Sequence, residues 1–495
     1  MNLCHKIHEL DNVAVALQDL TAGTEISIGD QSFALKTDVP MGHKFALVDI
    51  EDGGQIIKYG TSIGSTKTEV PQGTHLHTHN VKTNLSDVLE YSYEPAEPAL
   101  PVSPAEHNSF MGYRRANGKV GIRNEIWIIN TVGCVNKTAE MLAREATATA
   151  DGRHDGVYTF SHPYGCSQMG GDQLKTQQVL AGLARHPNAG GVLVLGLGCE
   201  NNHIAEFKKV LGEYDPKRIR FLSTQDVSDE IEAGHEIIEE LAEILKEDKR
   251  TECPVSDLVI GLKCGGSDGF SGITANPLIG RVADKIVATG GTAILTEVPE
   301  MFGAEHFLMS RAKDESVFKK TVDLVNNFKL YFQRYDQVVY ENPSPGNKAG
   351  GITTLEDKSC GCIQKGGTSP VVDVLDYTES PKLKGLNLLN GPGNDGVSVT
   401  NMIAAGAQIV LFSTGRGNPL GGPAPTLKIA TNTPLAEKKP RWIDFNAGRL
   451  LEGNPEEQVT NELYELILEV ANGKKAKNEI SGYKEIAIFK DGVTL

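Results

Sequence analysis

Three histidines alternate in the segment GTHLHTHN, residues 73–80, of this chain of 495 residues. In an extended strand their imidazoles would project from one face. Imidazole is a common ligand of transition metals, so three on one face could form part of a metal shell. The alternative is a solvated edge strand with a polar face. We expect His75, His77 and His79 to contact a metal or a substrate.

Four cysteines each stand in a turn that follows a run of apolar residues. These stretches read EIWIINTVGC, VYTFSHPYGC, VLVLGLGC and LVIGLKC, and they end at Cys134, Cys166, Cys199 and Cys264. A single cysteine in such a place is more often a small buried apolar residue than a ligand. Four in equivalent places predict that at least one is functional, although their spacing matches no zinc-ribbon pattern.

The turns that follow apolar runs also hold groups for acid–base chemistry and for binding an anion. SHPYGCSQ contains an imidazole, TEVPE two carboxylates and STGRG a guanidinium that suits a carboxylate. The carboxylates could instead cap the next helix, and the guanidinium could pair with a surface acid. The candidates are His162 and Glu297 for catalysis, and Asn201, Ser267, Asp268, Asn394 and Arg416 for substrate binding.

A long glycine-rich segment, residues 341–367, is too long for an idle connection. Lys348, Glu356 and Lys358 in it are candidates for acid or base, and Lys358 is the one we favour. Cys360 and Cys362 are too closely spaced for the usual CxxC redox motif. The alternative is a surface loop stiffened by its prolines.

The elements that must position these groups are parallel strands. From about residue 112 apolar runs alternate with amphipathic, helix-like stretches, which predicts βαβ units and a mostly parallel, Rossmann-like sheet. Ligands bind beyond the carboxyl ends of such strands. Because right-handed crossovers put those ends on one side, we expect the four cysteine turns to meet on one edge of a single sheet.

The fold class is therefore multidomain α/β. Residues 1–92 contain short alternating stretches and form a small all-β domain, and residues 93–111 form a proline-rich linker. Residues 112–250 form a first α/β region, and residues 251–495 form a C-terminal α/β region.

Composition excludes several classes of function. The net charge of −16 disfavours nucleic acid and anionic membranes as partners. No apolar run approaches the roughly 18 residues of a spanning helix, and the N-terminus lacks the apolar core of a signal peptide. We therefore expect a cytoplasmic protein whose eight cysteines are reduced. The GxG at Gly196 and Gly198 has Asn201 where a third glycine belongs, so a nucleotide cofactor is disfavoured.

Several long motifs together resemble the altronate/galactarate dehydratase family. They include YRRANGKVGIRNE, TVGCVN, SHPYGCSQ, GLGCENN, CGGSDGFSGITANP, TEVPEMFGAE, ENPSPGNKAGGITTLEDKS and the terminal IAIFKDGVTL. The likeness runs from near the start of the chain to its last residue. It implies an N-terminal β-clip domain of the SAF type, a dimerising middle region and a Rossmann-like C-terminal domain without a dinucleotide. It also implies a homodimer that depends on Fe²⁺ or Mn²⁺.

The activity that the resemblance implies is the dehydration of altronate to 2-dehydro-3-deoxygluconate in hexuronate catabolism. A chelated divalent metal would stabilise the charge that develops on the substrate carboxylate, and a base would remove the C2 proton. We expect His75, His77, His79 and one of the cysteines at the metal, Arg416 at the carboxylate, and Lys358 or Glu297 as base.

Three alternatives stay open at this point. The first is an iron–sulfur cluster held by three or four of six cysteines. The second is galactarate or another sugar acid as substrate. The third is a protein that binds a sugar acid without converting it. The six cysteines are Cys134, Cys166, Cys199, Cys264, Cys360 and Cys362.

Overall fold

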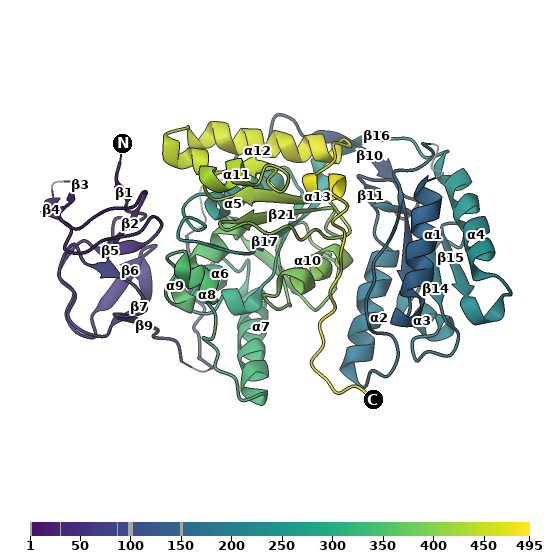
Figure 1. Cartoon of the computed structure of the whole chain (residues 1–495), viewed down its shortest axis with the longest axis horizontal. Helices are drawn as coiled ribbons and strands as arrows, with labels where there is room; N and C mark the ends of the chain where they lie inside the picture. Colours follow the sequence, from purple (N-terminus) through teal and green to yellow (C-terminus); the bar gives the residue numbers. More distant parts are fainter. Residues whose placement is uncertain (1, 30, 87, 98–101, 149–151) are drawn as a thin grey trace.

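The computed structural model describes residues 2–29, 31–86, 88–97, 102–148 and 152–495. Figure 1 shows three units in a row, with the C-terminal unit between the N-terminal and middle ones. The expected α/β class with a small all-β domain at the N-terminus is confirmed.

The N-terminal unit is built from short antiparallel strands. One sheet has the order β1-β2-β5-β8, a second has the order β6-β7-β9, and β3 pairs with β4. Val13, Ala16, Phe45 and Leu76 are buried, which explains why these stretches are apolar although they are short. The bounds are β1 Cys4–His5, β2 Val13–Ala16, β3 Glu25–Ile28, β4 Gln31–Ala34, β5 Lys44–Ala46, β6 Gln55–Lys58, β7 Thr61–Thr66, β8 His75–Leu76 and β9 Val81–Lys82.

The histidine segment is not the extended strand that its alternation predicts. Strand β8 ends at Leu76, and the chain then turns through residues 77–80. The turn forms because the side-chain oxygen of Asn80 accepts a hydrogen bond from the backbone N–H of His77 at 2.9 Å.

The middle unit is a four-stranded parallel sheet in the order β13-β12-β14-β15. Its strands are buried on both faces: Trp127 and Val194 pack on one side, and Ile128 and Leu195 on the other. This accounts for the continuous apolar runs. The bounds are β12 Glu125–Asn130, β13 Val157–Thr159, β14 Ala189–Gly196, β15 Ile219–Ser223, α1 Asn136–Ala148, α2 Gly171–Ala184, α3 Ile204–Leu211 and α4 Glu230–Leu245, with short helices η1 Gly133–Val135 and η2 Thr224–Asp226.

The C-terminal unit is a seven-stranded parallel sheet in the order β19-β20-β18-β17-β21-β22-β23. The strand order reverses between β17 and β21, the place where open α/β sheets bind ligands. The strands are β17 Val259–Cys264, β18 Thr292–Leu295, β19 Val371–Leu375, β20 Gly385–Leu389, β21 Ile409–Thr414, β22 Thr426–Ala430 and β23 Phe445–Asn446. The helices are α5 Ala275–Ala288, α6 Glu305–Met309, α7 Glu315–Arg334, α8 Pro345–Ala349, α9 Leu355–Cys362, α10 Asp395–Ala404, α11 Thr433–Lys438, α12 Glu456–Ala471 and α13 Lys477–Ile480, with η3 Val255–Asp257, η4 Val298–Glu300, η5 Ile363–Gly366 and η6 Gly448–Glu452.

The prediction that four cysteine turns share one edge of a single sheet is wrong. Cys134, Cys166 and Cys199 follow strands of the four-stranded sheet, whereas Cys264 ends β17 of the seven-stranded sheet. The physical cause lies after α4. There the chain forms β16 (Thr251–Pro254), which pairs antiparallel with β10 (Ser109–Arg114), so the first sheet stops and a second one begins.

The two ends of the middle unit are tied to the rest of the chain. Strand β10 also pairs with β11 (Val120–Gly121), so the last part of the expected linker 93–111 is in a sheet. Residues 98–101 of that linker lie outside the described residues. The C-terminal segment runs from α13 to the base of α2, where the backbone N–H of Leu495 donates to the carbonyl of Ser167 at 2.9 Å (Figure 1).

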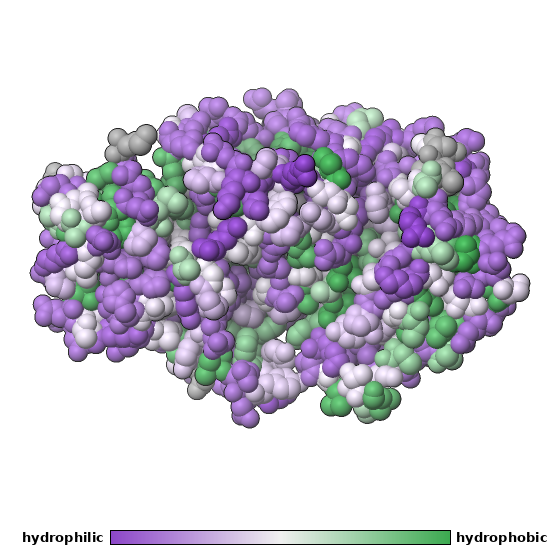
Figure 2. All heavy atoms as spheres, viewed as in Figure 1, coloured by the Kyte–Doolittle hydropathy of each residue, from purple (hydrophilic) through white to green (hydrophobic). Residues whose placement is uncertain are grey.

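The surface is mainly hydrophilic on the face shown in Figure 2, with scattered apolar side chains. Within the described part of the chain, no helix combines the length and the apolar character needed to cross a membrane.

Candidate active site

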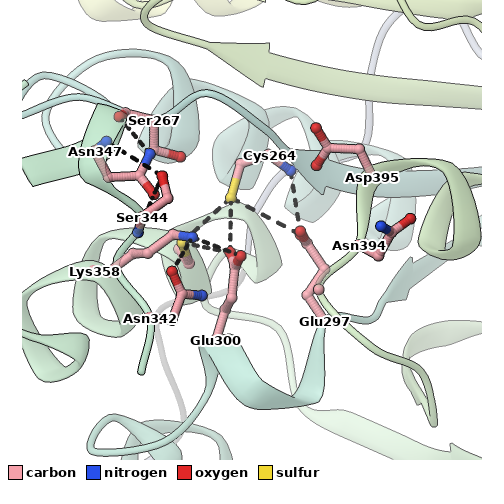
Figure 3. Close-up of polar contacts among 12 residues, drawn as sticks. Cys264, Ser267, Glu297, Glu300, Asn342, Ser344, Asn347, Lys358, Asn394 and Asp395 are labelled. Atoms are coloured by element: carbon pink, nitrogen blue, oxygen red, sulfur yellow. Dashed lines mark hydrogen bonds and ion pairs between the residues drawn. The ribbon is translucent and has the colours of Figure 1, made fainter. Parts of the chain in front are cut away.

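A buried cluster of charged side chains and thiols lies at the carboxyl edge of the seven-stranded sheet, beside the point where the strand order reverses. Lys263 and Cys264 come from the end of β17, and Glu297 and Glu300 from the turn after β18. Helix α9 and the following η5 cover them with Lys358, Cys362 and Lys365. Asp395 at the start of α10 borders the other side, opposite Lys358 (Figure 3).

Two thiols and a carboxylate form the centre of the cluster. The sulfurs of Cys264 and Cys362 are 3.2 Å apart, and Glu300 Oε2 is 3.3 Å from the first and 3.1 Å from the second. Within the described ranges, these are the three side chains of the His, Cys, Asp and Glu types whose ligand atoms all lie within 4.8 Å of one another. All three are buried.

Three ammonium groups surround this centre. Lys358 Nζ donates to Glu300 Oε1 at 2.8 Å, and Lys365 Nζ lies 2.8 Å from the sulfur of Cys264 and 3.0 Å from Glu297 Oε2. Lys263 Nζ donates to Glu297 and lies 2.8 Å from Asp395 Oδ1. So many opposite charges in one buried place are costly to desolvate, which is typical of an active site rather than of a stability device.

The two glutamates differ in their proton affinity. Burial raises the pKa of Glu297 above its usual range, although Lys263 and Lys365 oppose the shift. Burial acts in the same direction on Glu300, but Lys358, Lys263 and Lys365 hold the pKa of that carboxyl well below its usual range. Two neighbouring carboxyls whose environments separate their pKa values can take different roles in proton transfer.

The backbone at Glu297 supports a functional role for this residue. Its φ of 71° and ψ of 53° lie in the left-handed region, which a non-glycine residue adopts at a cost. The side chain is 1% exposed and is held by both Lys263 and Lys365. Tertiary contacts therefore hold Glu297 in a conformation that aims its carboxylate into the cluster.

The N-terminal unit closes this edge of the sheet. A Cβ atom at Gly269 would lie 1.8 Å from the carbonyl oxygen of Gly42, and one at Gly351 would lie 2.3 Å from it. Only glycine lets the two backbones approach this closely. Beside this contact, Lys44 and Lys58 of the N-terminal unit reach both carboxylate oxygens of Asp357 on α9, at 2.8 and 2.9 Å.

The histidines lie on the same interface, one loop away from the cluster. His77 Nε2 is 2.8 Å from the carbonyl of Lys348, and the side chain of Asn347 donates to the carbonyl of Ser267 at 2.9 Å. The structure brings His75, His77 and His79 together and adds His43, whose Nδ1 is 3.0 Å from His75 Nε2. No hydrogen bond joins these rings to Cys264 within the described residues.

The surroundings of His43, His75 and His77 favour the neutral form of their imidazoles. Burial, followed by the neighbouring imidazoles of His43, His77 and His79, lowers the pKa of His75 to about 3. Burial also lowers the pKa of His43 and of His77. Neutral imidazoles can accept a metal or a hydrogen bond.

The expected substrate-binding residues divide between two places. Ser267, Asn394 and Arg416 lie around the cluster. Ser267 is buried in the turn after β17, and Asn394 caps α10 (Figure 3). Arg416 is exposed after β21, and its backbone N–H donates to the carbonyl of Gly266 at 3.0 Å. The Arg416 side chain has no ion pair among the described residues. Asp268 is a framework group, because its carboxylate accepts hydrogen bonds from Ser271, Thr431 and Asn432.

The remaining candidates lie on the middle unit. His162 is buried, and its Nε2 is 2.8 Å from the carbonyl of Asn130. Burial lowers its pKa. Asn201 and the exposed thiols Cys134, Cys166 and Cys199 lie on loops of the four-stranded sheet. The structure does not bring these residues to Cys264.

The local sequence did not single out Lys263, Lys365 or His43. The sequence around Lys263 does indicate a functional role, because a lysine inside the apolar run LVIGLKC is buried and needs a carboxylate to neutralise its charge. The sequence around Lys365 and His43 gives no such indication, because residues distant in the chain position both side chains.

The donor set fits a metal ion. Thiols and a carboxylate suit a ferrous-type ion better than Mg²⁺. Cys264, Glu300 and Cys362 would be its ligands, and the ammonium groups of Lys358 and Lys365 would lie beside it.

Comparison with known proteins agrees with this organisation. Residues 3–84 match the altronate/galactarate dehydratase SAF domain. Residues 112–246 match the second domain of D-galactarate dehydratase/altronate hydrolase, and residues 255–494 match the C-terminal domain of D-galactarate/altronate dehydratase.

Full-length relatives are similar to the chain throughout. It is 55% identical to altronate dehydratases of Escherichia coli and of Bacillus subtilis, over 99% of each sequence. It is 34% identical to galactarate dehydratase (L-threo-forming) of Escherichia coli, over 98% of this chain and 96% of that one. The chain belongs to the D-galactarate/altronate dehydratase family.

Proposed function

We propose that the protein is a hydro-lyase that removes water from D-altronate and releases 2-dehydro-3-deoxy-D-gluconate, a step in the breakdown of hexuronates such as galacturonate. Altronate is the favoured substrate because identity to the altronate dehydratases is 55%, against 34% to the galactarate dehydratase. Galactarate is the second candidate.

The observation that carries the chemistry is the difference in pKa between Glu297 and Glu300. Glu297, with a raised pKa, is the base that takes the C2 proton of the substrate. Lys358 is the acid. Burial opposes its charge, but Glu300, Cys362 and Cys264 raise its pKa above the ordinary value, so it carries a proton at neutral pH.

The atoms balance in a simple elimination. The C2 proton passes to the Glu297 carboxylate, the C3–O bond breaks, and the departing hydroxyl leaves as water with a proton from Lys358. The resulting enol rearranges to the 2-keto product. Lys263 and Lys365 hold Glu297 in place and offset the negative charge that develops near it.

A ferrous or manganous ion at Cys264, Glu300 and Cys362, when bound, supplies positive charge that stabilises the substrate carboxylate as C2 loses its proton. The cluster of His75, His77 and His79 is the second candidate for metal binding. Iron content of purified Cys362→Ser and His77→Ala variants separates the two: the site whose variant loses iron is the metal site.

Arg416 is proposed to hold the substrate carboxylate, because its guanidinium is exposed at the strand-order reversal without an ion pair among the described residues. Ser267 and Asn394 would contact the hydroxyl groups. The cavity lined by Ser267, Lys358 and Cys362 has a volume of about 10 Å³, room for about one water molecule. This cavity does not by itself hold a six-carbon acid.

The test is turnover of a panel of hexonates and hexarates under anaerobic conditions, with Fe²⁺, with Mn²⁺ and with a chelator. We expect keto-acid product from D-altronate, less from galactarate, and none with the chelator. Glu297→Gln should lose activity at least about 100-fold. Glu125→Gln is the matched control and should stay active, because Glu125 is a buried carboxylate of the middle unit that pairs with Lys484 of the C-terminal segment. Binding of altronate without any product would support the sugar-acid-binding alternative instead.

We further propose a homodimer in the cytoplasm. Light scattering of the purified protein at about twice the chain mass of 53.3 kDa would support the dimer. A monomeric mass at assay concentration would contradict it. No nucleotide is needed for the proposed chemistry.

A further inference from the structure

The six cysteines that could hold an iron–sulfur cluster fall into two separate groups. Cys264, Cys360 and Cys362 are buried in the C-terminal unit, and two of them contact Glu300. Cys134, Cys166 and Cys199 are exposed and follow β12, β13 and β14, which are neighbours in the four-stranded sheet. We propose that these last three, here called the rim thiols, hold a four-iron, four-sulfide cluster, a second metal site distinct from the one beside Glu300.

The loops that carry the rim thiols are fastened to one another. The backbone N–H of Gly133 donates to the carbonyl of Tyr164, and that of Asn202 to the carbonyl of Gly165, both at 2.9 Å. A Cβ atom at Gly165 would lie 2.0 Å from the carbonyl oxygen of Thr131, so the first two loops meet backbone to backbone. The three loops therefore move as one body, which a cluster with ligands from three loops requires.

A buried polar framework beneath the rim explains the polar sequence CENNH after a core strand. Glu200 is 2% exposed. Its carboxylate accepts hydrogen bonds from the hydroxyl of Thr131 and from the backbone N–H groups of Leu197 and Gly198. Asn202 is fully buried and donates to the carbonyl of Thr131 at 2.9 Å. The hydrogen bonds of these buried groups are therefore made within the protein, and the exposed thiols are the reactive groups at the surface.

Polar groups already contact two of the sulfurs. The side-chain amide of Gln225 donates to the sulfur of Cys199 at 3.4 Å, and the thiol of Cys166 donates to Asn201 Oδ1 at 3.3 Å. Gln168 is 5% exposed, and its Nε2 has no partner in the described part of the chain. Of these groups, the Gln225 amide supplies an N–H contact to a sulfur, the kind of contact by which proteins tune iron–sulfur clusters.

The rim thiols are not arranged around a single ion. Four sulfurs around one tetrahedral zinc lie about 3.8 Å apart, from the 2.3 Å zinc–sulfur bond. Among the described residues, no rim sulfur belongs to a group of three or more ligand atoms that all lie within 4.8 Å of one another. A four-iron cluster spaces its ligands more widely. Lys365 Nζ lies 2.8 Å from the sulfur of Cys264, whereas among the described residues the sulfurs of Cys166 and Cys199 contact uncharged side chains.

Three cysteines can bind three of the four irons. The fourth iron is then left for water or for an oxygen of a hydroxy acid, since no fourth thiol of the described chain belongs to the rim. Assembly balances without an added oxidant: two Fe²⁺, two Fe³⁺ and four S²⁻ form a cluster core of charge +2, and each thiol loses one proton on binding iron. The proposal does not depend on the dehydratase assignment.

The test is anaerobic reconstitution of the full-length protein with equal Fe²⁺ and Fe³⁺ and with sulfide, followed by desalting. We expect about four iron and four acid-labile sulfide per chain at the rim, with a broad absorption band near about 400 nm. Replacing the rim thiols, singly or together (Cys134→Ser, Cys166→Ser, Cys199→Ser), should remove the sulfide and the band. The matched control, Cys264→Ser with Cys362→Ser, should retain both.

A second measurement uses the unaltered protein, so it does not depend on the variants folding. Alkylation followed by mass spectrometry should label the three rim thiols before reconstitution and spare them afterwards. Protein that binds iron without sulfide, rim thiols that stay reactive after reconstitution, or a band that disappears with the Cys264 and Cys362 control would each overturn the proposal. The readouts are spectroscopic, so loss of dehydratase activity alone would leave their outcome unchanged.

Discussion

The sulfurs of Cys264 and Cys362 lie 3.2 Å apart although the residues are 98 positions apart in the chain. One comes from the end of β17 and the other from the last residue of α9, so the pair exists only when the helix covers the sheet. The hydrogen bond with Cys264, then burial and the charge of Glu300, raise the pKa of Cys362, which keeps the thiol protonated in the absence of a metal.

This pair should make the enzyme sensitive to oxidants. A two-electron oxidant of the diazene type would join the two sulfurs, with loss of two protons and two electrons from the thiols. We expect inactivation that a dithiol reverses, and a peptide containing both residues in the mass spectrum. Cys360→Ser, on the same helix, should not protect, whereas Cys362→Ser should abolish the cross-linked peptide. Equal cross-linking in Cys362→Ser would show that another thiol reacts.

The pair of Lys44 with Asp357 should hold the N-terminal unit in place. Asp357→Asn leaves two buried ammonium groups, Lys44 and Lys58, without their counter-charge, which costs about 3–5 kcal/mol. Denaturant unfolding should show that loss. The exposed pair of Lys319 with Glu315 is the control, and Lys319→Met should change the midpoint little. An unchanged midpoint in Asp357→Asn would mean that the interface does not depend on this pair.

The same carboxylate predicts how stability changes with pH. Lys44 and Lys58 hold the pKa of Asp357 below its usual range despite burial, so the folded protein binds its proton less readily than the unfolded chain. The stabilisation is complete above the ordinary pKa of about 3.9 and is lost as the pH falls below it. The difference in unfolding free energy between wild type and Asp357→Asn should therefore shrink below about pH 4. A difference that stays constant down to pH 3 would contradict the assignment.

Arg416 should act on substrate binding more than on the chemical step. Arg416→Met removes the proposed contact with the carboxylate, so we expect KM for altronate to rise at least about 10-fold while kcat changes less. Arg449→Met is a suitable control, because Arg449 pairs with Glu462 away from the cluster. If kcat falls and KM does not, Arg416 acts in the chemical step.

Proton transfer gives a prediction for the pH profile. Because Glu297 must be ionised to act as base, and burial raises its pKa, kcat/KM should fall on the acid side at a higher pH than an ordinary glutamate would give. Lys358, whose pKa is raised, should not limit activity between pH 7 and about 9. Activity that is flat down to pH 4 would rule out Glu297 as the base.

Local patterns in the sequence were enough to predict much of this protein. Apolar runs followed by polar turns predicted parallel strands and drew attention to Glu297, Ser267 and Asn394 at their ends, because side-chain burial and turn chemistry depend on neighbours in the chain. Long motifs predicted the family. The small N-terminal β domain was also readable, from its short alternating stretches.

Tertiary structure decided which of those groups meet. Cys199 and Cys264 follow strands of the same kind, yet they lie on different sheets because β16 pairs with β10 and ends the first sheet. Lys365 meets Glu297, and Lys44 meets Asp357, across 68 and 313 positions of the chain. Such contacts depend on how the units pack against one another, and nothing in a local stretch of residues records that packing.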